Sequence, residues 1–342
     1  MGYTAQMDRQ LEQALLEWTL ENPRPLQGDA GARRYFRVDL PTGGTAVLAL
    51  YPDMEPNSDD AFQNFVTLHS YLSPILHLPE IYRYDEPDRA MLLEDVGDCS
   101  LEDRLAALPQ EEAFWADKVA WELENWVGPL TMAAPGGSFF MLRSFDKAKY
   151  DFEWSFCKKH FFNGLLNKNP PLWLDRMMEQ IHGYLEPRSK YLTHRDFHVR
   201  NLMVSDQRLI TIDFQDARLG PATYDLASIM FDGYWNWNQE SRRIFASRVR
   251  NGLGMNDKEF RSELISVALQ RNLKALGTFA CQLLTNGKTR FASAIPRTLR
   301  HIRSHFERIA HGEGVIQAKN WLIRAKDRIE KEWPDKTQSP EL

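Results

Sequence analysis

Cysteine is scarce in this sequence, and its placement excludes two kinds of small stabilised domain. The chain of 342 residues contains three cysteines, Cys99, Cys157 and Cys281. They are odd in number and far apart, and no CxxC pair occurs. Neither a disulfide framework nor a zinc site is therefore predicted.

Long apolar runs are also missing. No stretch reaches the roughly 18 apolar residues of a membrane-spanning helix. The first 20 residues carry charges throughout and lack the apolar centre of a signal peptide. We therefore expect a cytoplasmic protein without a membrane partner.

The chain as a whole has no basic excess. It contains 42 Lys and Arg against 47 Asp and Glu, a net charge of −5. A nucleic-acid polymer is therefore not an expected partner, because it would require the opposite balance. The charge is uneven, since residues 241–330 hold 18 basic and 7 acidic side chains, a local net of +11. Solvated helix faces would explain this segment, and the alternative is a basic wall that favours an anionic substrate.

The order of the expected elements predicts an α+β protein in two lobes. The first third contains short apolar runs of strand length, and the chain after Gly97 has mainly helical spacing. Strands first and helices later favour this fold class. We expect an N-terminal nucleotide-binding lobe at residues 1–95 and a C-terminal catalytic and substrate lobe at residues 96–342. The expected N-terminal strands are residues 35–38, 46–51 and 91–93.

The most informative segment is His194-Arg195-Asp196-Phe197-His198-Val199-Arg200-Asn201, followed by Asp213-Phe214-Gln215. Its spacing is the H-R-D-x-x-x-x-N pattern of the catalytic loop in protein-kinase-like enzymes. In that loop the Asp accepts or orients the proton of the substrate hydroxyl, and the Asn binds Mg²⁺. Asp196 is therefore the predicted catalytic residue, and Asn201 and Asp213 are the predicted magnesium ligands.

The residues between these motifs predict a β-hairpin. Residues 201–204 and 209–212 are strand-like, and residues 205–208 are typical of a turn. Directly opposed residues in such a pair lie roughly 5 Å apart. Asn201 would then lie opposite Ile212, so that Asn201 and Asp213 reach the same end of the hairpin. The alternative is a plain hairpin whose Asp and Asn residues only cap turns.

Asp225 follows a Gly-Pro turn and is expected in the first turn of a helix, where its charge suits the helix dipole. That position explains the residue by itself. A second role, in which Asp225 braces the catalytic loop, is the alternative.

These residues resemble the aminoglycoside-phosphotransferase and choline-kinase superfamily, which shares the protein-kinase-like fold. Within it, the sequence is similar to the bacterial anomeric kinases of N-acetylmuramate and N-acetylglucosamine in peptidoglycan recycling. The resemblance implies a bilobal α+β fold, with a β-rich N-terminal lobe and a mainly helical C-terminal lobe that carries the catalytic hairpin. It also implies ATP and Mg²⁺ as cofactors and a sugar hydroxyl as acceptor. The residues that carry it are 28–37, 194–201, 212–226 and 270–280.

The resemblance also implies where the nucleotide is held. Residues 28–35 would cover the phosphates, and residues 93–96 would form the hinge whose backbone meets the adenine. The candidate nucleotide-binding residues are Gly28, Asp29, Gly31, Arg33, Arg34, Tyr35, Glu94 and Val96.

One departure concerns the cation that meets the phosphates. Many relatives carry a Lys on the third strand, paired with a Glu on the next helix. Here residues 47–51 contain no Lys, and residues 61–72 contain no Glu. Because both partners are missing together, we expect Arg33 or Arg34 to replace the lysine. The alternative is a weakened or inactive kinase.

Four residues are candidates for the substrate. Arg271 falls on a helical stripe where an apolar residue is expected, so it forms an internal salt bridge or contacts a substrate anion. Trp235 stacks on a sugar ring or packs in the core, as does its neighbour Trp237. Glu153 has the same two alternatives, and for His198 a structural role is favoured over substrate contact.

Three classes of function remain open at this point. The amino-sugar kinase is preferred. An aminoglycoside kinase or other small-alcohol kinase is the second, although a polycationic drug would require carboxylates where residues 241–330 are basic. The third is a non-catalytic nucleotide-binding protein.

Overall fold

The computed structural model describes residues 3–26, 33–52, 60–127, 143–309 and 311–333. Its contacts divide the chain into two compact units. The sheet unit comprises Met1–Ser100 and Leu202–Asp216, and the helical unit comprises Leu101–Asn201 and Ala217–Leu342. Asp196 and Asn201 therefore belong to the helical unit, and Asp213 belongs to the sheet unit. The functional division at residue 95 stays a prediction.

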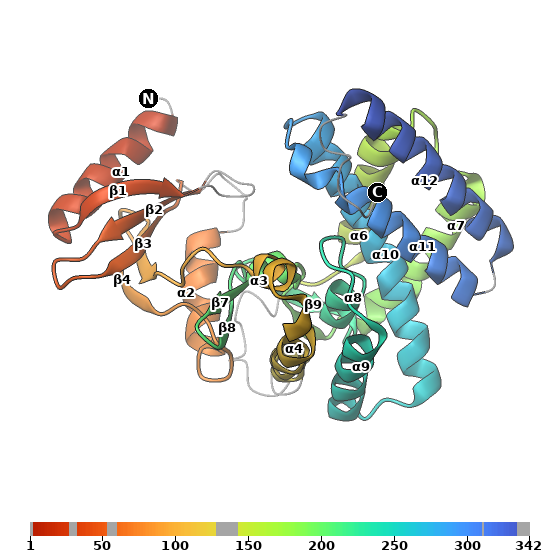
Figure 1. The fold of residues 1–342 in the computed structure, drawn as a ribbon, viewed down its shortest axis with the longest axis horizontal. Helices are drawn as coiled ribbons and strands as arrows, with labels where there is room; N and C mark the ends of the chain where they lie inside the picture. Colours follow the sequence, from red (N-terminus) through yellow and green to blue (C-terminus); the bar gives the residue numbers. More distant parts are fainter. Residues whose placement is uncertain (1–2, 27–32, 53–59, 128–142, 310, 334–342) are drawn as a thin grey trace. The chain divides into compact units, whose positions relative to one another are not determined.

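The sheet unit contains a five-stranded antiparallel sheet in the order β1-β2-β3-β5-β4 (Figure 1). The predicted strands occur in β2, β3 and β5, whereas β1 and β4 were not predicted. β1 contains Pro23 and Pro25 and lies at an edge, where a residue without an N–H is tolerated. The bounds are β1 Glu21–Leu26, β2 Arg34–Asp39, β3 Thr45–Leu50, β4 Ile81–Asp85 and β5 Ala90–Glu94.

Two helices complete the N-terminal part of this unit, α1 (Tyr3–Glu17) and α2 (Ala61–Leu72). The apolar face of the sheet buries Val38, Leu48 and Leu50, and Trp18 after α1 joins the same core. These sheet residues alternate along their strands, because successive side chains of a strand point to opposite faces. α2 has the bounds that its apolar spacing predicts, and it contains no Glu.

The predicted hairpin is present in the sheet unit. β7 (Leu202–Ser205) pairs antiparallel with β8 (Arg208–Thr211), from Leu202 opposite Thr211 to Ser205 opposite Arg208. Asp206 adopts a left-handed φ of 54° in the turn, which an Asp tolerates better than most residues. This register confirms the turn at Asp206 and Gln207.

The helical unit is built around the long helix α10 (Asp257–Leu284), which packs against α6, α7, α8 and α11 (Figure 1). Its apolar side joins one core with α6, α7, α11 and α12. A short pair of strands, β6 (Tyr191–Thr193) and β9 (Arg218–Gly220), flanks the predicted catalytic segment. The other helices are α3 Leu101–Ala107, α4 Glu112–Val127, α6 Lys147–Cys157, α7 Leu172–Leu185, α8 Tyr224–Met230, α9 Gln239–Leu253, α11 Ala294–Arg308 and α12 Gly312–Glu332.

Gly277 sets the distance between α6 and α10. A Cβ atom at this position would lie 2.7 Å from the Cα atom of Cys157, a separation that packed atoms do not tolerate. The two backbones therefore approach closely only because residue 277 is glycine. This close packing matters for the site, because α6 carries Lys149 and Glu153 while α10 carries Arg271 and Lys274.

None of the helices in the described ranges combines the length and apolar composition that a bilayer crossing requires.

Candidate active site

The predicted catalytic segment, in the helical unit, is braced by a buried carboxylate. The backbone N–H groups of His194 and Arg195 donate to the two oxygens of Asp225, at 2.7 and 3.0 Å. Arg195 has a φ of 79°, a left-handed conformation that persists only where neighbouring contacts hold it. Burial raises the pKa of Asp225, and the two N–H groups oppose that shift. The contact confirms that Asp225, in the first turn of α8, braces the loop.

A second carboxylate holds the other end of the loop and was not predicted. Asp232 is 1% exposed and accepts hydrogen bonds from the backbone N–H groups of Val199 (3.0 Å) and Tyr234 (2.8 Å). Burial raises its pKa to about 6. Asp225 and Asp232 thus fix residues on both sides of Asp196.

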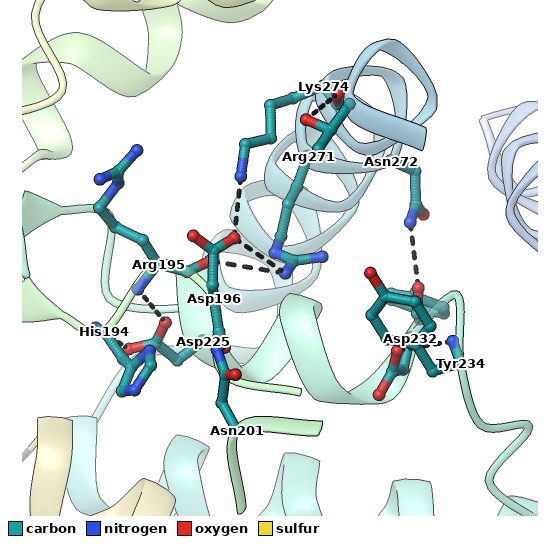
Figure 2. A network of polar contacts seen from close by, with 12 residues as sticks. His194, Arg195, Asp196, Asn201, Asp225, Asp232, Tyr234, Arg271, Asn272 and Lys274 are labelled. Carbon is teal, nitrogen blue, oxygen red and sulfur yellow. Dashed lines mark hydrogen bonds and ion pairs between the residues drawn. The ribbon is translucent and has the colours of Figure 1, made fainter. Parts of the chain in front are cut away.

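Asp196 lies between the cations of α10. Figure 2 shows the side chains of Lys274 and Arg271 directed at its carboxylate, whereas the Arg195 side chain extends away from it. The Lys274 Nζ atom is 2.8 Å and the Arg271 Nη2 atom 4.0 Å from Asp196 Oδ1. Burial would raise the pKa of Asp196, but Lys274, Arg195 and Arg271 outweigh burial and hold it well below its ordinary value. Asp196 is therefore ionised at neutral pH.

Lys274 was not among the predicted site residues, because no local motif requires it. It is 78 residues from Asp196 in the chain. One signal could have identified it. Lys274 lies three residues after Arg271, so the two side chains share a face of α10, and that face already contained an unexpected charge.

Asn201 contacts the same loop. Its Nδ2 atom donates to the backbone carbonyl of Asp196, at 2.9 Å. The bond uses the amide nitrogen, so the amide oxygen is the atom that a metal ion would bind. An amide oxygen is a suitable donor for Mg²⁺.

Asp213 belongs to the sheet unit and follows β8. It has a φ of 63°, a second left-handed residue at a motif position. Its Oδ1 atom accepts a hydrogen bond from Gln215 (2.6 Å) and lies 3.5 Å from Arg33 Nη2. Phe214 is buried and packs on Phe65 of α2, with ring centroids 4.6 Å apart. This anchor fixes the backbone on which Asp213 is presented.

The two candidate replacements for the strand lysine differ in their contacts. Arg33 is directed at Asp213, and its side chain is 17% exposed. Arg34 pairs with Asp8 of α1 at 2.6 Å and lies over the ring of Phe36. Arg33 is therefore the cation next to a predicted magnesium ligand, and Arg34 is occupied elsewhere in the sheet unit.

The positions of the other predicted nucleotide-binding residues do not test their roles. Gly28, Asp29 and Gly31 lie outside the described residues. Tyr35 is half-buried on β2, where burial raises its pKa. The side chain of Glu94 pairs with Arg208, at 2.9 Å. Their nucleotide-binding roles stay predictions.

Val96 lines a cavity of about 490 Å³ within the sheet unit. Arg37, Asp95 and Asp98 also line it, and they pair with one another. A pocket for a base is mostly apolar, so this charged lining does not by itself identify an adenine site.

The predicted substrate residues fall into different environments of the helical unit. Glu153 is 4% exposed and accepts a hydrogen bond from Gln270, at 2.9 Å. His198 packs edge-on against Tyr234, and burial lowers its pKa to about 3, so it is neutral. Trp235 is half-buried and donates to Glu112, at 3.2 Å. The neighbouring Trp237 is buried in the core.

A metal site made by the protein alone is not present in the described part of the chain. There, no three His, Cys, Asp or Glu side chains converge on one point. Mg²⁺ that arrives with nucleotide phosphates requires fewer protein ligands. The oxygen donors of Asn201 and Asp213 suit that ion, and their role as ligands stays a prediction.

Known proteins resemble this chain in sequence and in fold. Residues 144–264, which include the catalytic loop, match the pattern of the phosphotransferase enzyme family. The chain is also 28% identical, over 300 residues, to a protein named N-acetylmuramate/N-acetylglucosamine kinase from Neisseria meningitidis. That alignment covers 82% of this chain and 85% of the relative.

Solved structures of phosphotransferases share the fold of the chain. Aminoglycoside phosphotransferase APH(2'')-Ib, solved with ADP, superposes with a TM-score of 0.55 at 13% identity, covering 86% of this chain and 97% of that one. Choline kinase LicA from Streptococcus pneumoniae gives a TM-score of 0.53 at 12% identity, covering 84% and 98%. These likenesses confirm the predicted α+β, protein-kinase-like fold. The matched family region and the kinase relative support a phosphotransferase that uses a hydroxyl group as acceptor.

Proposed function

We propose that the protein transfers the γ-phosphoryl group of ATP, with Mg²⁺, to the anomeric hydroxyl of N-acetylmuramate or N-acetylglucosamine. The product is a sugar 1-phosphate for peptidoglycan recycling. The name of the Neisseria relative supports the sugar. The observation that carries the catalytic part is the ionised Asp196, which Lys274 and Arg271 hold in a braced loop.

In this proposal Asp196 orients the attacking hydroxyl. A carboxylate with a low pKa is a weak base, so it accepts the proton late in the reaction. That timing suits phosphoryl transfer, whose transition state is loose and depends on positioning and charge neutralisation. A hemiacetal hydroxyl is also more acidic than an ordinary alcohol, which lowers the demand on the base.

The nucleotide side of the reaction rests on the sheet unit. We propose residues 1–95 as the nucleotide-binding lobe and residues 96–342 as the catalytic and substrate lobe. Asn201 and Asp213 would hold Mg²⁺, which when bound neutralises charge on the phosphates. Arg33 would contact a phosphate, because its planar fork can donate two parallel hydrogen bonds. Since ATP is available in the cytoplasm, we propose that location for the reaction.

The test is turnover of ATP against a panel of amino sugars and aminoglycosides, followed by phosphorus NMR of each product. We expect a 1-phosphate from N-acetylmuramate, N-acetylglucosamine or both. A 6-phosphate would overturn the anomeric assignment. Turnover of aminoglycosides with neither sugar would overturn the substrate class and leave the phosphotransferase intact.

The metal assignment is tested separately by calorimetry of ATP binding. Asp213→Ala should abolish the Mg²⁺-dependent tightening of ATP binding in the folded variant. Unchanged tightening would locate the metal site elsewhere.

A further inference from the structure

Positive charge exceeds negative charge where α6, α10 and the catalytic loop meet. Each of these charged groups lies within 4.0 Å of a neighbour of opposite charge, so they form one cluster within the helical unit. Its cations are Lys149, Arg195, Arg271 and Lys274, and its carboxylates are Asp196 and Glu153.

The part of the cluster around Asp196 is well paired. Lys274 forms a hydrogen bond of 2.8 Å to the carboxylate. Arg271 adds its charge at 4.0 Å and reaches the backbone carbonyl of Arg195 at 3.5 Å. These two cations are therefore directed at the residue that meets the reacting hydroxyl in the proposed function.

The contacts of Glu153 with the cations are long. Glu153 Oε1 lies 3.6 Å from Lys149 Nζ and 4.0 Å from Arg195 Nη2, and both distances exceed a normal hydrogen bond. Its other oxygen accepts from Gln270. One carboxylate oxygen thus faces two cations without a hydrogen bond to either.

The pKa of Lys149 reflects this surplus of positive charge. Burial lowers its pKa to about 8, and repulsion from Arg195, Arg218 and Lys274 adds to that effect while Glu153 opposes it. Its side chain is 22% exposed, so an incoming anion can reach the ammonium group. Phe152 lies beside it, with the Nζ atom 5.3 Å from the ring centroid, and is 61% exposed. A charge without full compensation, next to an exposed apolar ring, is suited to a ligand that carries both kinds of group.

We propose that Lys149 forms a subsite for the carboxylate of an acidic sugar, so that the enzyme favours N-acetylmuramate over N-acetylglucosamine. This inference rests on the proposed function. The subsite lies beside Glu153 and not beside Asp196. It would therefore hold a substituent of the sugar and not the hydroxyl that reacts. In N-acetylmuramate the lactyl carboxylate is attached through the oxygen of carbon 3, two carbons from the anomeric carbon. Such a substituent suits a cation near the catalytic residue.

Phosphoryl oxygens of the nucleotide are the other anions that could bind this cation. The two sources predict different kinetics. A carboxylate subsite affects the acidic sugar selectively, whereas a phosphate contact affects every acceptor alike because all use the same ATP.

The experiment compares kcat/KM for N-acetylmuramate and N-acetylglucosamine in four proteins, the wild type, Lys149→Met, Lys149→Arg and Lys147→Met. Lys147 is the matched control, because it lies two residues away on α6 with a side chain 65% exposed and pairs with Asp151 at the surface. Lys149→Met should reduce kcat/KM for N-acetylmuramate roughly 10- to 100-fold more than for N-acetylglucosamine, the scale of a charged hydrogen bond. Lys149→Arg should restore part of the selectivity, and Lys147→Met should preserve it.

An equal loss with both sugars, or no loss with either, would overturn the subsite and leave the sugar-kinase proposal standing. A wild-type protein that phosphorylates neither sugar would overturn the proposed function instead. In that case calorimetry of N-acetylmuramate binding decides the subsite. Weaker binding to Lys149→Met than to wild type supports it, and equal or absent binding overturns it.

Discussion

Two clusters of charged side chains differ in their charge balance. The Arg37 cluster of the sheet unit consists of Arg37, Asp95 and Asp98. The Asp196 cluster of the helical unit consists of Asp196, Glu153 and the cations around them, Lys149, Arg195, Arg271 and Lys274. In the sheet unit one cation, Arg37, lies between Asp95 and Asp98, with hydrogen bonds of 2.7 and 2.8 Å. Thr45 adds a bond of 2.6 Å to Asp95. Every charged group there has a partner at hydrogen-bond distance, and the excess charge is negative.

In the helical unit the ion pairs of Lys149, Arg195 and Arg271 with Glu153 and Asp196 are 3.6 to 4.0 Å long. A fully paired cluster contributes to stability and offers little to a ligand. A cluster with uncompensated charge costs stability, and such a cost is typical of functional sites. The comparison therefore assigns Arg37 a structural role and Lys149 a binding role, and the following changes test the difference.

Asp196→Asn should have the largest effect, because it removes the charge that orients the acceptor hydroxyl. We expect kcat to fall roughly 10²- to 10⁴-fold, with little change in nucleotide affinity. Steady-state kinetics and ATP calorimetry on the folded variant check both points. Near-normal turnover would refute the catalytic assignment.

Lys274→Met should reduce kcat/KM roughly tenfold or more, because it removes a charged hydrogen bond to Asp196. It should also change the pH profile. Lys274 lowers the pKa of Asp196, and the reaction requires the ionised carboxylate, so activity is lost as pH falls through that pKa. Without Lys274 the pKa rises and the acid limb moves to higher pH.

The control for this change is Lys258→Met, at the exposed start of the same helix. It should leave the acid limb where it is. An unmoved limb in Lys274→Met would show that Lys274 does not tune Asp196.

Arg33→Ala should raise the Michaelis constant for ATP roughly tenfold, the scale of one charged hydrogen bond to phosphate. Arg34→Ala is the matched control, since Arg34 is paired with Asp8. Initial rates at varied ATP measure both. Equal effects, or two silent substitutions, would contradict the assignment of Arg33.

Arg37→Ala tests the paired cluster. We expect the free energy of unfolding to fall by roughly 1–2 kcal/mol, because Asp95 would lose its main partner. Selectivity between the two sugars should persist. Arg24→Ala is the comparison, since its pair with Asp39 is exposed on a neighbouring strand and should matter little. Urea denaturation of the three proteins decides the point.

Lys149→Met should have the smallest effect on stability. The informative result is whether Tm rises or falls. The pKa of Lys149 in the folded protein is about 8, below that of an unfolded lysine. The folded state therefore binds fewer protons between pH 8 and roughly 10.4, and stability rises with pH across that window. Below pH 8 the charge costs stability in full. We expect Lys149→Met to raise Tm at pH 7 by roughly 2 °C and by less at pH 10. A lower Tm at pH 7 would mean that the lysine is structural.

Local patterns were sufficient for much of the fold and for the centre of the site. The loop spacing, the hairpin register and the bounds of α2 are set by residues that are close in sequence. They follow from turn chemistry and apolar periodicity, and the structure reproduces them. The strand β1 was not predicted because its two prolines weaken the strand pattern, and only its edge position makes it possible.

The amino-acid sequence by itself determined the kinase-like motif, the absence of the strand lysine, and the residue types available to bind a phosphate or a metal. The tertiary structure decided which of them meet. It paired Arg34 with Asp8 and directed Arg33 toward Asp213. Through the close packing at Gly277, it brought Lys149 and Glu153 of α6 to the cations of α10. These contacts depend on helix packing and burial between segments up to 180 residues apart, which no local pattern of residues encodes.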